Sequence, residues 1–245
     1  MDLRGNALIL PDGARGSRPG NDVARMQAML RRNENNFLYL LIGLLVVLLL
    51  APIGVGRFEG IVNLAFTLTM VTGVWSLAKS RSAYIVGWIL GSLSLLISVF
   101  DLASAGPWLL PLGAGVALLF CGTSMVIVLG EVLFGPHLTV NRMAGAVCVY
   151  LLLGLSWAFV YGFIFLAAPG SFEGIPPESP EGQFLTLVYY SFVTLTTMGY
   201  GDITPVSHLA RALAYLEAVT GVMYVAVLVA SLIGSADPRT GKSGS

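Results

Sequence analysis

The sequence predicts an all-α integral membrane protein with six spanning helices and a shorter re-entrant helix between the fifth and the sixth. The first observation is composition: 56% of the 245 residues are hydrophobic. Only 11% are charged, about half of the usual fraction in soluble domains. The mean hydropathy of the chain is +0.83. Such a chain has too few polar groups to cover a soluble surface, so we expect a membrane protein.

The second observation is the number of long apolar stretches. A bilayer core of about 30 Å takes roughly 20 apolar residues of helix. The predicted spans are residues 37–55, 61–78, 83–100, 107–130, 143–168 and 209–234. Because the first span follows a long polar leader and ends without a small-residue cleavage site, a removable signal peptide is not expected.

The third observation is the distribution of basic residues. With both termini inside, eleven basic residues fall on the cytoplasmic side and two, Arg57 and Arg211, fall outside. The eleven are Arg4, Arg15, Arg18, Arg25, Arg31, Arg32, Lys79, Arg81, Arg142, Arg239 and Lys242. This asymmetry predicts a multi-pass protein of the cell (inner) membrane with both termini cytoplasmic.

The segment between the last two spans does not fit a simple crossing. "PGSFEGIPPESPEG" (169–182) reads as a loop because of its prolines and glycines. "QFLTLVYYSFVTLTT" (183–197) reads as a helix too short and too hydroxyl-rich to cross, and "MGYGDITP" (198–205) follows it. Extended backbone at membrane depth is tolerated only where it is buried in protein or lines water.

Extended backbone at that depth could bind a desolvated cation. Carbonyl oxygens aimed at one axis replace the hydration shell of the ion, and Gly199 and Gly201 allow the dihedral angles that this needs. Thr197 adds a hydroxyl oxygen at the inner end. One chain supplies one loop, so enclosing an ion requires several copies of the chain.

The stretch resembles the filter of the potassium channel family, whose motif T-x-G-Y-G-D is matched by residues 197–202. The resemblance covers about residues 140–234. It implies a fourfold homotetramer with a selectivity filter formed by Thr197, Met198, Gly199, Tyr200 and Gly201. By the same resemblance, potassium would bind the carbonyls of Thr197, Met198, Gly199 and Tyr200 and the hydroxyl of Thr197.

Two positions depart from the family pattern. Met198 stands where valine or isoleucine is common, which changes packing behind the filter more than selectivity. Val193 stands where some bacterial members have a glutamate that bonds the filter aspartate, so that clamp on Asp202 is missing. The residues expected to support the filter are Thr196, Asp202, Tyr189, Tyr190, Val193 and Glu217.

The last span is expected to contain the inner gate. By position in the family pattern, Gly221 corresponds to a hinge, and Val222, Val225, Val229 and Ile233 would line the cavity. Some of these residues could instead serve ordinary helix packing.

Glu217 is the one acidic residue deep within a predicted span. On a helical wheel it lies away from the valine stripe, so we expect it to reach sideways toward the short helix, with Thr194, Thr196 and the tyrosines as hydroxyl donors. A ring of four carboxylates in the cavity is the alternative.

The first four spans are not expected to sense voltage. The fourth, residues 107–130, contains no lysine or arginine, whereas a sensor must move several charges through the field. The whole chain is similar to short bacterial six-helix ion channels with an apolar first half. Its predicted parts are a cytoplasmic leader (1–36), an apolar four-helix domain (37–135), a pore domain (136–235) and a short cytoplasmic tail (236–245).

The sequence thus predicts a voltage-independent potassium channel and not an enzyme. Potassium as the permeant ligand is the only small molecule expected, with no cofactor, nucleic acid or accessory subunit besides the lipid around the homotetramer. Cys121 and Cys148 are read as packing residues. A weakly selective cation channel, an ion-coupled transporter and a non-conducting scaffold that retains the loop are the alternatives.

Overall fold

The computed structural model describes residues 36–54, 81–103, 109–134 and 139–236, and all of them belong to one compact unit, residues 36–245. The predicted span 61–78, the leader and the tail lie outside the described residues. The helices are α2 (Asn36–Gly54), α4 (Arg81–Ala103), α5 (Leu109–Phe134), α6 (Val140–Ala167), α7 (Pro180–Leu195) and α8 (His208–Ala236). Two short strands, β1 (Phe172–Glu173) and β2 (Thr204–Pro205), accompany them.

Three of the described helices are long and apolar enough to cross a membrane. The candidate spans are Pro111–Leu133 in α5, Val140–Ala167 in α6 and His208–Ser231 in α8. The apolar runs of α2 and α4, Phe37–Pro52 and Ile85–Ile97, are shorter. The chain is therefore helical and membrane-embedded, while the count of six spans stays a prediction.

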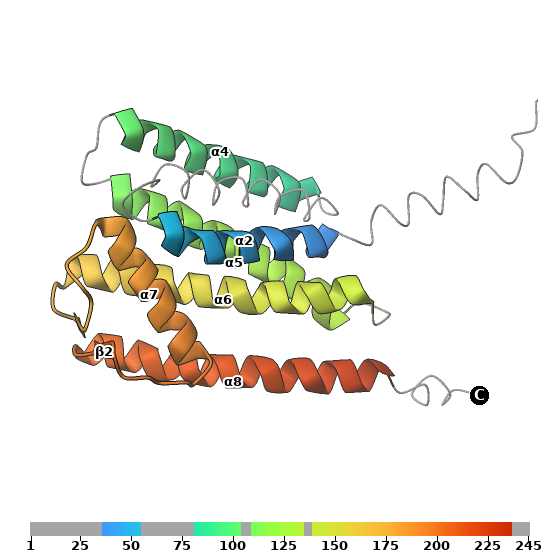
Figure 1. Cartoon of the computed structure of the whole chain (residues 1–245). Coiled ribbons are helices and arrows are strands. Elements are labelled where there is room, and N and C mark those ends of the chain that lie inside the picture. Colours follow the sequence, from blue (N-terminus) through green and yellow to red (C-terminus); the bar gives the residue numbers. More distant parts are fainter. Residues whose placement is uncertain (1–35, 55–80, 104–108, 135–138, 237–245) are drawn as a thin grey trace, which may run out of the picture. The chain divides into compact units, whose positions relative to one another are not determined.

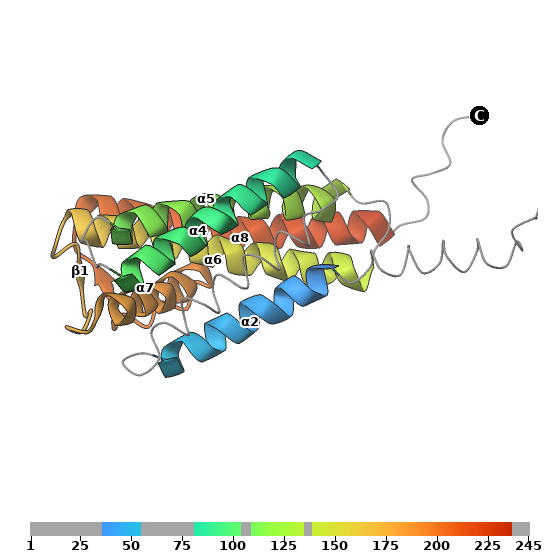
Figure 2. The same ribbon diagram turned by 90° about the horizontal axis from the view of Figure 1, so that it is seen from above.

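Helix α6 is the centre of the packing. Both α2 and α5 lie along it, and α4 packs against α5 on the outside (Figures 1 and 2). The start of α2 is tied to the start of α6, because the Phe37 amide donates to Asn141 Oδ1 at 2.9 Å. Beside it, the Arg142 guanidinium donates through Nε to the Val132 carbonyl at 2.6 Å, in the last turn of α5. Arg142 thus caps a helix end whose carbonyls have no partner within the helix.

A small antiparallel ladder modifies the all-α prediction. Phe172 pairs with Pro205 and Glu173 with Thr204, inside segments that the sequence assigned to loops. The Val206 amide extends the pairing to the Ser171 carbonyl at 2.8 Å. Phe172 is buried against Tyr161 and Tyr190, and this aromatic contact holds the ladder in place.

Helix α7 begins three residues before the predicted start at residue 183. Ser179 caps it, with its Oγ accepting from the Gly182 amide, and Pro180 fills the first turn, where a missing amide donor costs least. The prolines and glycines that suggested a loop therefore include the start of the helix.

Candidate functional site

Helix α7 is held between the two spanning helices α6 and α8 by close backbone approaches. A Cβ added at Gly154 of α6 would meet the Phe192 ring of α7 at 2.7 Å. A Cβ added at Gly221 of α8 would collide with the Leu195 carbonyl oxygen at the end of α7. Figure 1 shows α7 crossing α6 obliquely and ending beside α8. Glycine is required at Gly221 because the obstacle there is backbone, whereas a side chain at Gly154 would force the Phe192 ring to move.

The loop after α7 has an alternating backbone conformation. The φ angles of Thr197, Gly199 and Gly201 are +59°, +60° and +77°. In a regular β-strand, successive carbonyl groups point to opposite sides. Where residues alternate between positive and negative φ, successive carbonyl groups point to the same side. Thr197 is strained there, since a β-branched residue at positive φ costs about 1–2 kcal/mol. The sequence predicted positive φ at the two glycines but not at the threonine.

The amides of the loop point back to α7. The Met198 amide donates to the Val193 carbonyl at 2.9 Å and the Gly199 amide to the same oxygen at 3.4 Å. The Thr197 amide donates to the Thr194 carbonyl at 2.9 Å. Val193 therefore contributes its backbone to the site and fixes the loop from behind.

A tyrosine holds the outer end of the loop. Tyr189 Oη donates to Asp202 Oδ2 at 2.7 Å, from the position where an aromatic cuff was expected. This hydrogen bond raises the pKa of Tyr189 above its ordinary value. The Asp202 carbonyl oxygen also lies so close to Gly174 that a Cβ there would collide with it. Asp202 thus has a side-chain clamp, although Val193 cannot supply one.

Glu217 is completely buried beside α7. Its Oε2 accepts from Tyr161 Oη at 2.5 Å, and its Oε1 lies 2.5 Å from Ser191 Oγ. The sequence predicted Thr194, Thr196 and the tyrosines as its partners, but Thr196 Oγ1 bonds the Phe192 carbonyl instead, at 2.6 Å. Both actual partners are completely buried, on α6 and α7. No sequence pattern marked Tyr161 or Ser191, because each is an ordinary residue of an apolar helix.

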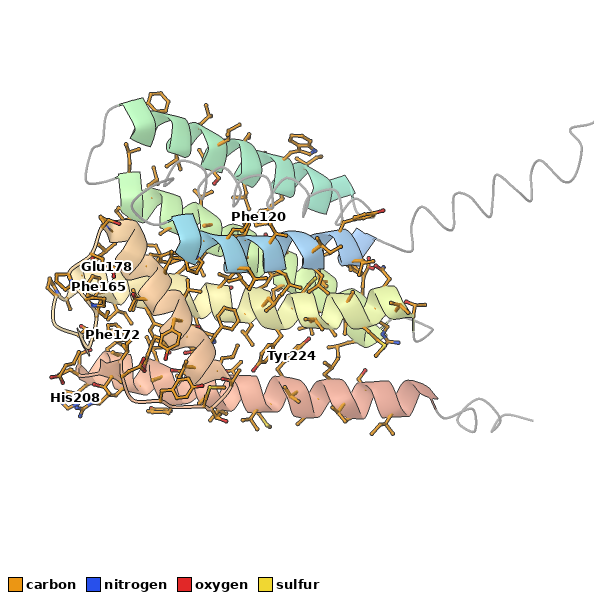
Figure 3. The ribbon with its side chains drawn as sticks, in the orientation of Figure 1. Phe120, Phe165, Phe172, Glu178, His208 and Tyr224 are labelled. Carbon is orange, nitrogen blue, oxygen red and sulfur yellow. The ribbon has the colours of Figure 1, made fainter. Side chains whose placement is uncertain are left out.

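The two faces of α8 differ in exposure. Gly221 is buried, and Tyr224 Oη donates to the Ala146 carbonyl of α6 at 2.7 Å. Figure 3 shows Tyr224 between α6 and α8. The predicted cavity residues are exposed in the single chain: Val222 53%, Val225 47%, Val229 48% and Ile233 67%. The buried stripe that includes Glu217 therefore packs within the chain, and the valine stripe is free to face something else.

The structure brings most of the predicted residues together. Thr196, Thr197, Met198, Gly199, Tyr200 and Gly201 form one exposed loop, backed by Tyr189, Tyr190, Val193 and Glu217. Within the described part of the chain, no group of three or more histidine, cysteine or acidic side chains could hold a metal ion.

Comparisons with known proteins include a family match over this part of the chain. Residues 146–235 match the model of a family described as ion channel. The voltage-gated potassium channel Kch of Escherichia coli is 27% identical over 150 residues, 61% of this chain and 33% of that protein. The calcium-gated potassium channel TvoK of Thermoplasma volcanium is 39% identical over 50 residues, 20% of this chain and 14% of that protein.

A third relative, protein LctB of Geobacillus stearothermophilus, is 36% identical over 90 residues, 35% of this chain and 65% of that protein. No solved structure matches the chain. The matches with the two named channels cover a third or less of each of those proteins.

Proposed function

We propose that the chain is a potassium-selective channel, supported by the match of residues 146–235 to an ion channel family and by two relatives named as potassium channels. The observation that carries the proposal is the alternation of positive φ at Thr197, Gly199 and Gly201. With the amides directed back to α7, the carbonyls are the groups left for a cation. They would replace its hydration shell, as in the carbonyl filters of potassium channels.

The ion ligands in this proposal are the carbonyls of Thr197, Met198, Gly199 and Tyr200 and the Thr197 hydroxyl. Gly201 supplies the last positive φ, and Asp202 ends the filter at its outer mouth. Potassium is the permeant ligand, and conduction needs no other cofactor. The family match points to a transport protein and not to an enzyme.

We propose that four chains enclose the ion. One chain provides a single filter loop, and its side chains Met198 and Tyr200 are 57% and 65% exposed in the single chain. Val222, Val225, Val229 and Ile233 are similarly exposed on α8 and would line the central cavity. In a closed ring of identical subunits, one interface repeats between neighbouring chains and covers these exposed side chains in each of them.

The end of α7 adds an electrostatic contribution. The helix ends at Leu195, immediately before the filter, and helix C-termini carry partial negative charge that favours cations. In a fourfold ring, four such ends would converge below the filter. This supports a cavity that holds a cation before it enters the filter.

The first four helices are proposed to brace the pore without sensing voltage. Helix α5 contains no lysine or arginine, and its one acidic residue is Glu131 near the end. Each charge moved through 100 mV contributes about 2.3 kcal/mol, so a helix without mobile charge has no coupling to the field. The Escherichia coli relative is named voltage-gated, and this chain is proposed to differ from it in that respect.

The proposed location is the inner cell membrane with both termini in the cytoplasm. The charge asymmetry of the sequence supports this orientation, with Arg142 as a special case. Arg142 is only 6% exposed, and its guanidinium is hydrogen-bonded to the end of α5. Its position therefore reflects helix packing as well as membrane orientation.

Ion flux through reconstituted vesicles tests the function. The purified full chain should form a tetramer and pass potassium but not sodium, with block by barium. Flux of both ions would favour a weakly selective cation channel. No flux from an intact tetramer would favour a scaffold that retains the loop.

A further inference from the structure

Three helices meet at one buried carboxyl group beside the proposed filter. Glu217 of α8, Tyr161 of α6 and Ser191 of α7 are each 0% exposed. The 2.5 Å contacts of Oε2 with Tyr161 and of Oε1 with Ser191 therefore join all three elements. The pocket is complete within a single chain, so it does not depend on how the chains assemble.

The protons in this cluster can be counted. Ser191 Oγ lies 2.7 Å from the Gly154 carbonyl oxygen and 2.5 Å from Glu217 Oε1. A serine hydroxyl has one proton, and a carbonyl oxygen has none. With an ionised carboxylate, one of these two contacts would bring acceptors together with no proton between them. A proton on Glu217 satisfies both contacts: Glu217 donates to Ser191, and Ser191 donates to Gly154.

The surroundings favour the same arrangement. The titratable groups that face Glu217 in the described part of the chain are tyrosines: Tyr150 and Tyr161 from α6 and Tyr190 from α7. A tyrosine is neutral at physiological pH and can donate to only one of the two carboxyl oxygens. A charged side chain within a span costs at least a few kcal/mol, whereas a neutral carboxyl group with both oxygens bonded avoids that cost.

We infer that Glu217 is a positioning residue kept as a neutral carboxylic acid, which accepts from Tyr161, donates to Ser191 and so fixes α7 between α6 and α8. Its effect on conduction rests on the proposed function. Ser191 precedes Val193 on α7, and the Val193 carbonyl accepts the Met198 amide of the filter. Holding Ser191 therefore holds the filter from behind. Deprotonation would leave the single Ser191 proton for two acceptors, so either the Glu217 or the Gly154 hydrogen bond would be lost, and a charge would be buried between the three helices.

Infrared spectroscopy of the purified full chain tests the protonation state without any measurement of conduction. The difference spectrum between the parent and Glu217→Gln at neutral pH should contain the carbonyl band of a protonated carboxylic acid. Ser191→Ala and Tyr161→Phe should each shift that band, because each removes one hydrogen bond to the carboxyl group. The matched control is Glu173→Gln at the exposed residue of β1, which should leave the band unchanged. A difference spectrum with only carboxylate bands would overturn the inference.

Conservative rescue tests the positioning role. The amide of Glu217→Gln can donate to Ser191 and accept from Tyr161, so tetramer yield and potassium selectivity should stay within about twofold of the parent. Glu217→Ala removes both contacts and should reduce flux by at least about tenfold. Parent flux should fall as pH rises above neutral, while Glu217→Gln should show no such fall until the strongly alkaline range in which Tyr189 itself ionises. Loss of flux in an intact Glu217→Gln tetramer, or full flux in Glu217→Ala, would contradict the role.

The two failures are distinguishable. If the parent itself passes no potassium, the proposed function fails, while the infrared band still decides whether Glu217 is protonated. If the parent conducts and the band is absent, the inference about Glu217 fails alone.

Discussion

Gly221 lies against the carbonyl oxygen of Leu195, so that α8 contacts the last turn of α7 with no side chain between them. By its position in the family pattern, Gly221 was expected to be a hinge in the inner helix. In the structure α8 continues through this residue from His208 to Ala236. The glycine has a packing reason of its own, because any larger residue would push α8 away from the helix that carries the filter.

Gly221→Ala should therefore destabilise the tetramer or the filter. Overpacking a tight contact costs about 1–3 kcal/mol, and here the neighbour is backbone that cannot turn aside. Thermal unfolding and potassium flux measure the effect. The matched control is Gly122→Ala in α5, where an added Cβ meets nothing within 4 Å. If Gly221→Ala proves as harmless as the control, the close contact has no energetic importance.

Gly199→Ala should abolish selective conduction by a different mechanism. An added Cβ at Gly199 meets nothing within 4 Å, but the φ of +60° disfavours a side chain by about 1–2 kcal/mol. The loop should relax and misdirect its carbonyls. Reversal potentials under mixed potassium and sodium check this, with Gly122→Ala again as control. A variant that still excluded sodium as the parent does would show that the filter is assigned to the wrong residues.

Tyr189→Phe should weaken the outer end of the filter. The change removes the hydrogen bond to Asp202 and keeps the ring, at a cost of about 1 kcal/mol. Sustained potassium current should decline faster than in the parent. Tyr39→Phe on the exposed face of α2 is the matched control. Currents that decline equally in both variants would argue against a clamp.

The same clamp predicts a response to alkaline pH. The hydrogen bond stabilises the protonated phenol and raises the pKa of Tyr189. The clamp is therefore complete below the ordinary pKa of tyrosine and is lost as pH rises through the raised value. Current decline should accelerate only in strongly alkaline solution, and Tyr189→Phe should not show this change.

Val229→Asp tests the inner gate. Val229 is 48% exposed on α8, and a ring of four valines could close the proposed cavity by dewetting. Four carboxylates at this level should keep the cavity wet, so the closed state should conduct. Single-channel recording gives the answer, with Val126→Asp on the exposed face of α5 as control. An unchanged closed state would place the gate elsewhere.

Voltage steps should move no gating charge through the first four helices. Helix α5 has no basic residue to carry such charge, so the open probability should vary little between opposite voltages of equal size. Gating-current measurement on the full chain checks this. Several elementary charges per tetramer would refute the proposal.

The sequence by itself determined the features that depend on neighbouring residues. The filter motif, the short helix before it and the two stripes of α8 follow from local dihedral preference and from a helical period of 3.6 residues. For example, the sequence places the Glu217 stripe and the valine stripe on different faces of α8, because both stripes belong to one helix. Such features need no knowledge of what packs against the helix.

Only the tertiary structure decided which distant groups meet. Tyr161 and Glu217 are 56 residues apart in sequence, and Ser191 and Glu217 are 26 apart. Their contact depends on how closely α6, α7 and α8 approach, which Gly154 and Gly221 allow. Helical periodicity gives the direction of a side chain but not the distance to its neighbour. For that reason the sequence directed Glu217 toward the short helix yet named the wrong hydroxyl partners.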